Sequence, residues 1–403
     1  MVLGFVRHGA FFRQPLLATT GRLCLVTSPG RRFSTPASPK RSDPLRILFC
    51  GSDAFSLSSL VALQDEKVAN PELIEAIEVF MLPVKKSGRF FKLRREVPCE
   101  VFANLKKLKI HERETFHKWE LPPGINLIIA VSFGLFVPGR LIRAAKYGGL
   151  NIHPSFLPDL RGPAPLHRAM LRWDRHFGIS LQTLDERRFD HGVVLAQTPR
   201  PGEPIAHDAH LKDVWSRASE AGAQMLMQGL RDGLHVPPYR SVIPEEEEKD
   251  LTHAHKVVKA DSYVQWEKWK TFGDFDLRYR VVNWVWFWAY NRLNTLSRVI
   301  IHEMRPCSME SIESRIHQKG TLSVTDQMVG QRLEIPVVIF DKHSLAMRIG
   351  DEDQGEWVEL QNVKSENEKC RKDVAKALDR YIQYQETEET GLTHQGGSEH
   401  EAQ

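Results

Sequence analysis

The first half of the chain alternates short apolar runs with segments of helical periodicity, and this alternation limits the possible folds. Residues 126–131 contain five consecutive apolar positions, which is typical of a strand buried on both faces of a parallel sheet. We expect further strands at 46–50, 77–82, 147–152, 178–184 and 193–197. We expect helices at 55–63, 98–105, 165–173 and 209–230, and a basic helix that ends near 146. Strands separated by helices predict an α/β fold with a mostly parallel sheet.

The pattern changes after residue 235. Residues 236–250 include Pro237, Pro238 and four consecutive glutamates, which is the composition of a charged linker. Short β-type runs then predict a small barrel; they lie at 297–301, 320–324, 333–340, 345–349 and 357–361. A helix is expected at 371–384 and a disordered polar tail at 386–403. The predicted domains are therefore 43–235 and 251–385, joined by the linker 236–250.

Residues 1–42 form a separate basic segment. They hold seven of the chain's 55 lysines and arginines and no acidic residue. Without these seven the 51 acidic residues are in excess, so global charge gives no support for nucleic-acid binding. The composition is typical of a mitochondrial transit peptide, with Arg31-Arg32-Phe33-Ser34 predicting cleavage near Phe33. The alternative is a disordered arm without a targeting role.

Other bulk features exclude several classes of protein. The five cysteines form no CxxC pair, which argues against a zinc site or a disulfide framework and suits a reducing compartment. No apolar run is long enough to span a membrane. The turn Gly51-Ser52-Asp53 has one glycine where a dinucleotide fingerprint needs three, so a nicotinamide or flavin site is not expected.

The stretch from Asn151 to Pro165 contains candidate catalytic residues. Asn151 and His153 are two residues apart on an expected strand, so their side chains share a face. An amide can donate to a developing oxyanion, and an imidazole can exchange a proton near neutral pH. The following loop holds four prolines from Pro154 to Pro165, which favours a fixed shape. This pattern indicates acyl-type transfer.

This stretch resembles the Asn-x-His-x-Ser signature, continued by Leu-Pro-x-x-Arg-Gly-x-x-Pro, of the folate-dependent formyltransferases. Among these it is most similar to the methionyl-tRNA formyltransferases, from about residue 45 to about residue 266. The resemblance implies a Rossmann-like catalytic domain followed by an OB-like domain that binds tRNA. It also implies that Asn151 and His153 are catalytic.

The resemblance places a catalytic aspartate in the loop between the last two strands of the first domain. Asp190, followed by Gly192, matches that motif, whereas Val193 stands where a second acidic residue is common. A carboxylate there would fix the tautomer of His153 and raise its basicity. Asp185 is the alternative in the same loop.

The cofactor implied by the resemblance is 10-formyltetrahydrofolate, and no metal is expected. We expect four residues of the proline-rich loop to contact it: Ser155, Phe156, Leu157 and Pro158. Residues 133–137 and 186–189 are expected to form the walls of the pterin pocket. The exposed apolar side chains expected in this turn are better explained by a flat ligand than by a core.

A basic loop interleaved with aromatic residues lies at 85–95. Its six cations are Lys85, Lys86, Arg89, Lys92, Arg94 and Arg95, with two consecutive phenylalanines among them. Cations beside stacking surfaces suit an RNA end, although a solvated surface loop is the alternative. The methionyl-tRNA formyltransferases, which the chain resembles, have a basic insertion at this place that contacts the acceptor arm of initiator tRNA. A second aromatic cluster, at 283–288, is expected to be core between the domains.

These features together predict a formyltransferase of the mitochondrial matrix. The expected reaction is formyl transfer to the amino group of initiator methionyl-tRNA for translation initiation. No membrane and no obligate protein partner are implied. Two alternatives remain open: an enzyme of the same fold that acts on a small-molecule amine or on water, and a non-catalytic RNA-binding or assembly protein.

Overall fold

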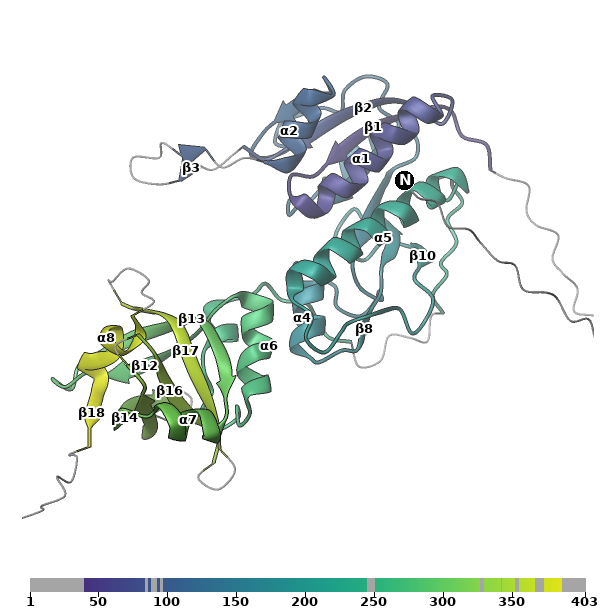
Figure 1. The fold of residues 1–403 in the computed structure, drawn as a ribbon. Helices are drawn as coiled ribbons and strands as arrows, with labels where there is room; N and C mark the ends of the chain where they lie inside the picture. Colours follow the sequence, from purple (N-terminus) through teal and green to yellow (C-terminus); the bar gives the residue numbers. More distant parts are fainter. Residues whose placement is uncertain are drawn as a thin grey trace, which may run out of the picture. The chain divides into compact units, whose positions relative to one another are not determined.

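The computed structural model describes residues 40–83, 86–87, 93–94, 97–244, 251–326, 330–341, 343–351, 355–366 and 373–385 (Figure 1). Its first sheet has seven strands in the order β10-β9-β7-β6-β1-β2-β5. Their bounds are β1 Leu45–Cys50, β2 Ile74–Met81, β5 Lys109–Glu112, β6 Leu127–Val131, β7 Gly149–His153, β9 Ser180–Thr183 and β10 Val194–Gln197. The pairing is parallel except at β9, which runs antiparallel to both neighbours. Two short antiparallel strand pairs lie outside this sheet. They are β3 Lys86–Ser87 with β4 Leu93–Arg94, and β8 His176–Phe177 with β11 Glu203–Pro204.

Helices cover this sheet, with bounds α1 Ala54–Ala69, α2 Pro98–Leu105, α3 Gly139–Ala144, α4 Pro165–Leu171 and α5 Leu211–Arg231. Helix α1 begins where the Asp53 carboxylate accepts a hydrogen bond from the Ser56 amide at 2.9 Å. Helices α1 and α5 pack side by side (Figure 1), linked by a hydrogen bond between Ser58 and Ser219. At Gly222 of α5, a Cβ atom would lie 2.7 Å from the Ile152 side chain. Helix α5 therefore approaches β7 closely and fixes the strand that carries the expected catalytic residues.

The second sheet is antiparallel and has the order β12-β13-β17-β16-β15-β14-β18, with an additional β12–β14 pairing that closes it. Its strands are β12 Val285–Tyr290, β13 Leu296–Cys307, β14 Gln318–Asp326, β15 Gln331–Ile339, β16 Leu345–Ile349, β17 Glu356–Ser365 and β18 Ile382–Tyr384. The helices of this part are η3 Lys259–Ser262, α6 Phe272–Val282, α7 Met309–Arg315, α8 Val374–Leu378 and η4 Asp379–Tyr381. A mostly parallel α/β sheet followed by a β-rich unit confirms the predicted fold class.

Two expectations for the β-rich part were wrong. The aromatic cluster at 283–288 is mostly the strand β12, whose alternate residues Val285 and Phe287 are fully buried in the core of the β-rich part itself. Because side chains alternate across a strand, Trp286 and Trp288 lie on the other face of β12. Trp284, just before the strand, is 41% exposed. The expected helix at 371–384 ends early, because Ile382–Tyr384 pairs with β14 as β18.

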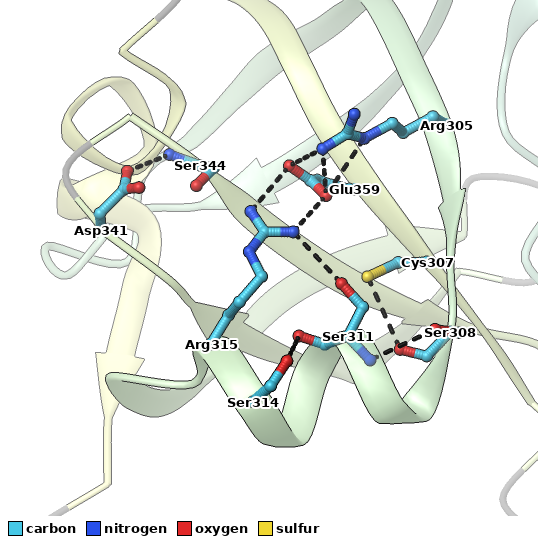
Figure 2. Close-up of polar contacts among 9 residues, drawn as sticks. All are labelled: Arg305, Cys307, Ser308, Ser311, Ser314, Arg315, Asp341, Ser344 and Glu359. Atoms are coloured by element: carbon cyan, nitrogen blue, oxygen red, sulfur yellow. Dashed lines mark hydrogen bonds and ion pairs between the residues drawn. The ribbon is translucent and has the colours of Figure 1, made fainter.

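Helix α7 is held to the barrel by a buried carboxylate (Figure 2). Glu359 of β17 is 4% exposed and accepts hydrogen bonds at 3.0 Å from the guanidinium groups of Arg305 and Arg315. Burial raises the pKa of Glu359, but the two guanidinium groups outweigh it and the net pKa is lowered. The Arg315 guanidinium also stacks over the Phe340 ring at 4.1 Å. Glu359 thus joins α7 to β17 and β17 to β13, and the Phe340 contact attaches α7 to the end of β15.

Within the described residues, no helix is long and apolar enough to cross a membrane. The predicted transit peptide lies outside these residues except for its last three positions, and the expected disordered tail lies wholly outside them. Both therefore stay predictions, as do the domain boundaries.

Candidate active site

Strand β7 places Asn151 and His153 on one face of the sheet, as their spacing predicted. The intervening Ile152 points to the opposite face and is buried. His153 is 5% exposed, and Asn151 is half-buried. Both side chains face the loop between β9 and β10, which carries Asp190.

Asp190 is the centre of a polar network. Its Oδ1 accepts hydrogen bonds from the side-chain amides of Asn151 at 3.3 Å and Gln182 at 3.1 Å. Its Oδ2 accepts the Gly162 amide at 3.0 Å, and its carbonyl accepts Arg161 Nε at 2.9 Å. These contacts fix the position of the carboxylate.

Gln182 was missed at the sequence level. It lies on β9 directly opposite Asn151, so only the antiparallel register of β7 and β9 brings its amide to Asp190. A sequence pattern that assumes parallel neighbours gives no sign of this pairing.

The His153 ring connects the aspartate to a backbone carbonyl. His153 Nε2 lies 2.9 Å from the Leu160 carbonyl oxygen, and His153 Nδ1 lies 3.4 Å from Asp190 Oδ1. A carbonyl oxygen can only accept, so Nε2 carries a hydrogen. Nδ1, the other ring nitrogen, faces the Asp190 carboxylate. The geometry thus provides a His–Asp pair that can hold and release a proton.

These groups face a cavity of about 480 Å³. Asn151, His153, Gln182 and Asp190 lie in its polar wall. Residues 133–137, which were expected to form a wall of the ligand pocket, line it. Arg188 and Phe189, from the second expected wall, line it as well. The Phe136 and Phe189 rings meet edge to face with centroids 5.1 Å apart. The cavity combines a flat apolar surface with a few polar groups, as small-ligand sites do.

Asp185, the alternative aspartate, has another structural role. Its Oδ1 accepts the backbone amides of Arg187 at 2.8 Å and Arg188 at 2.7 Å. Burial raises the pKa of Asp185, but these two amides outweigh it and the net pKa is lowered. Asp185 closes the turn, whereas Asp190 faces His153.

Ser155, Phe156, Leu157 and Pro158, which were expected to contact the cofactor, do not line this cavity, and their contact with the cofactor stays a prediction. Leu157 is 2% exposed and Pro158 is also buried. Ser155 and Phe156 line a second cavity of about 280 Å³, where the Arg200 guanidinium lies over the Phe156 ring at 4.0 Å. The loop buries these apolar side chains in the protein, so they do not require a ligand to cover them.

Two histidines that sequence reasoning did not assign to the site do line the cavity. His167 lies on α4. Burial, with a smaller contribution from Arg168, lowers the pKa of His167. His253 reaches the cavity from the segment that follows the charged linker.

The six cations expected to bind tRNA lie outside the part that the structure describes in full. Of these positions only the backbone of Lys86 and Arg94 is described, and these two residues pair across the β3–β4 hairpin. In the described parts of the chain, no group of three or more metal-ligating side chains occurs.

Comparison with known proteins identifies the family of the chain. The formyl transferase family model matches residues 45–230. The mitochondrial methionyl-tRNA formyltransferase of Saccharomyces cerevisiae is 32% identical over 281 residues, which are 59% of this chain and 68% of that protein. The chain belongs to the methionyl-tRNA formyltransferase family. The Bos taurus mitochondrial methionyl-tRNA formyltransferase is 31% identical over 60% of this chain, which spans 58% of the bovine length. A solved sugar N-formyltransferase from Shewanella sp. aligns with a TM-score of 0.46 and 15% identity, covering 62% of this chain and 95% of that one.

Proposed function

We propose that this member of the methionyl-tRNA formyltransferase family transfers a formyl group from 10-formyltetrahydrofolate to the amino group of methionyl-tRNA, in the mitochondrial matrix. The observation that carries the proposal is the convergence of Asn151, His153 and Asp190 on one cavity of about 480 Å³. The mitochondrial names of the yeast and bovine relatives support the location.

The cavity fits a folate in shape and chemistry. The apolar residues 133–137 and Phe189 give a surface on which a flat ring system can pack. The volume lies in the range of sites that enclose most of a small molecule. The folate supplies the formyl carbon and the nitrogen from which that carbon departs.

The residues of the chain account for the remaining requirements of the reaction. The amine of the aminoacyl group forms a bond to the formyl carbon, and the bond from that carbon to its former nitrogen breaks. The Asn151 amide can donate to the formyl oxygen as negative charge develops on it. His153, held by the Leu160 carbonyl and Asp190, can accept the proton that the amine loses. The same imidazole can return a proton to the departing nitrogen.

The acceptor is proposed to be methionyl-tRNA, with the basic loop 85–95 as its contact. Six cations and two phenylalanines in eleven residues suit a phosphate backbone with unstacked bases. We propose that Arg89 approaches the 3′ end and that two to four of the loop's cations contact phosphates.

Incubating purified protein with 10-formyltetrahydrofolate and initiator methionyl-tRNA tests the reaction. Formyl-methionine released from the tRNA by base should appear with wild-type protein and be nearly absent with Asp190→Asn. Formate release without formyl-methionine would indicate a hydrolase and reject the proposal. Formylation of a free amino acid or amino sugar at a comparable rate would reject tRNA as the substrate.

Fusing residues 1–42 to a fluorescent protein tests the location. The fusion should enter the matrix and be shortened near Phe33, and a variant with Arg31 and Arg32 changed to alanine should be imported but cleaved poorly. A cytosolic signal would reject the targeting role.

A further inference from the structure

Residues 252–261, which the sequence assigned to the second domain, lie against the proline-rich loop of the catalytic site. The Leu160 amide donates to the Thr252 carbonyl at 2.8 Å, and the Ala254 amide donates to the Arg161 carbonyl at 2.7 Å. The Ala164 amide donates to the Ala254 carbonyl at 3.2 Å. The Ala254 side chain is buried against Leu160. The two segments are thus paired through their backbones over several residues.

Leu160, Arg161 and Gly162 of this loop also form hydrogen bonds with the catalytic pair, His153 and Asp190. The Leu160 carbonyl accepts from His153, the Gly162 amide donates to Asp190 Oδ2, and Arg161 Nε donates to the Asp190 carbonyl. Three consecutive residues therefore stand between the 252–261 segment and the His–Asp pair.

The backbone of this loop needs outside support. Leu160 has a φ of 57°, a left-handed conformation that is unfavourable for a bulky side chain and persists where the surroundings enforce it. Gly162 has a φ of 123°, and a Cβ atom there would lie 2.7 Å from the Ala254 carbonyl oxygen. Only glycine permits the segment to approach this closely.

The far end of the segment is anchored by one arginine of α4. Arg168 Nε donates to the His255 carbonyl at 2.9 Å, and its Nη2 donates to the Lys256 carbonyl at 3.0 Å. Its guanidinium also forms a bidentate ion pair with Asp261, at 2.6 and 2.9 Å. Burial raises the pKa of Asp261, but Arg168 and the Val258 amide outweigh it, so the net pKa is lowered and the carboxylate stays charged.

We propose that residues 252–261 are a positioning element of the active site. Their backbone pairing holds the Leu160 carbonyl and the Gly162 amide, and through them the orientation of His153 and the place of Asp190. Catalysis then depends on the backbone hydrogen bonds of a segment that is distant in sequence. The inference rests on the proposed function for its kinetic test only.

Ala254→Pro is the direct test, because it removes the amide that donates to Arg161 while leaving the His–Asp pair intact. The kcat should fall about ten- to a hundredfold, as small misplacements of catalytic groups do, while KM for folate and for methionyl-tRNA changes much less. The pH profile of kcat should shift, since the contacts that fix the His153 proton are loosened. Ala254→Gly, which keeps both backbone groups, should recover most of the lost kcat.

Arg280→Gln is the matched control. Arg280 is a buried arginine of α6 that donates to the Ala209 carbonyl at 2.8 Å, so it joins α6 to the catalytic part without touching the 160–162 loop. Below its melting temperature this variant should keep the wild-type kcat and pH profile. An equal loss of kcat in Arg280→Gln would overturn the proposal, because the effect would then come from general loosening.

Hydrogen exchange separates this inference from the proposed function. The Leu160 and Gly162 amides should exchange faster in Ala254→Pro and in Asp261→Asn than in wild type, whatever the substrate of the enzyme is. Unchanged protection of these two amides in both folded variants would overturn the inference. A wild-type protein without formyl transfer would reject the proposed function alone.

Discussion

Asp190 holds a backbone conformation that few aspartates adopt. Its φ of 57° lies in the left-handed region, and the contacts from Gly162 and Arg161 maintain it. Such a residue contributes to the site through exact placement of its carboxylate as well as through charge. Substitutions that preserve its shape therefore separate the two contributions.

The Asp190→Asn variant keeps the side-chain shape and removes the negative charge. We expect turnover to fall by about a hundredfold or more, because His153 loses the partner that holds its proton. The melting temperature should change little. Steady-state kinetics at saturating folate checks this, with Asp185→Asn as the comparison. Near wild-type turnover in Asp190→Asn would remove Asp190 from the mechanism and favour Asp185.

Asn151 offers a second single-residue test. Asn151→Ala should cost roughly 3 kcal/mol of transition-state stabilisation, comparable to the loss of one oxyanion donor. Folate affinity, measured by fluorescence or calorimetry, should change much less. If affinity falls while the single-turnover rate of formyl transfer is unchanged, Asn151 binds the ligand but does not act in the chemical step.

At the scale of elements, sequence reasoning succeeded where the signal is local. The unbroken apolar run predicted β6, and a helix was predicted at the bounds that α2 has, Pro98–Leu105. β5 was missed because its sequence, Lys-Ile-His-Glu, is mostly polar at a sheet edge. α6 was missed although Thr271 and Asp274 form a capping box at its start.

In the candidate site, too, the features with a local sequence signal were predicted and the others were not. The shared face of Asn151 and His153 follows from the two-residue period of a strand, and resemblance pointed to Asp190. The Leu160 carbonyl, the Gly162 amide and the 252–261 segment were not predictable, because they act through backbone groups paired over long sequence separations. The exposure expected for the apolar side chains of the turn was wrong for Leu157, which is buried in the protein.

Our prediction about the choice of tRNA as substrate concerns the basic loop 85–95. Replacing Lys85, Lys86, Arg94 and Arg95 by glutamine should weaken tRNA binding and lower the slope of log affinity against log salt. If two to four of the replaced cations contact phosphates, the slope should fall by about 1.5 to 3.5 units. Folate binding should be unchanged.

Arg89→Leu is the internal comparison for this loop. Its turnover should fall more than its tRNA affinity, because Arg89 is proposed to position the aminoacyl end. A quadruple variant that formylates methionyl-tRNA with an unchanged KM at physiological salt would show that the loop is only a solvated surface.

For the molecule as a whole, a buried histidine at the end of α5 links stability to pH. His235 is 1% exposed, and among the described residues neither of its ring nitrogens has a hydrogen-bond partner. Burial, with a contribution from the nearby Lys40 ammonium, lowers the pKa of His235 from 6.5 to about 4. Lys40 itself donates to the carbonyls of Val236 at 2.6 Å and Pro238 at 2.7 Å, so the cation is fixed there.

Since the folded pKa of His235 lies below the unfolded value, the unfolded chain binds the proton more tightly. The folded state therefore keeps its full stability from this group above pH 6.5 and loses it progressively as the pH falls toward 4, by about 3 kcal/mol in all. Urea unfolding at several pH values should show this loss in wild type. His235→Leu, which cannot titrate, should have a flatter acid limb, whereas the exposed-site control His117→Leu should keep the wild-type slope. Equal acid slopes in wild type and His235→Leu would mean that other groups, such as the carboxylates of Asp261 and Glu359, control acid unfolding.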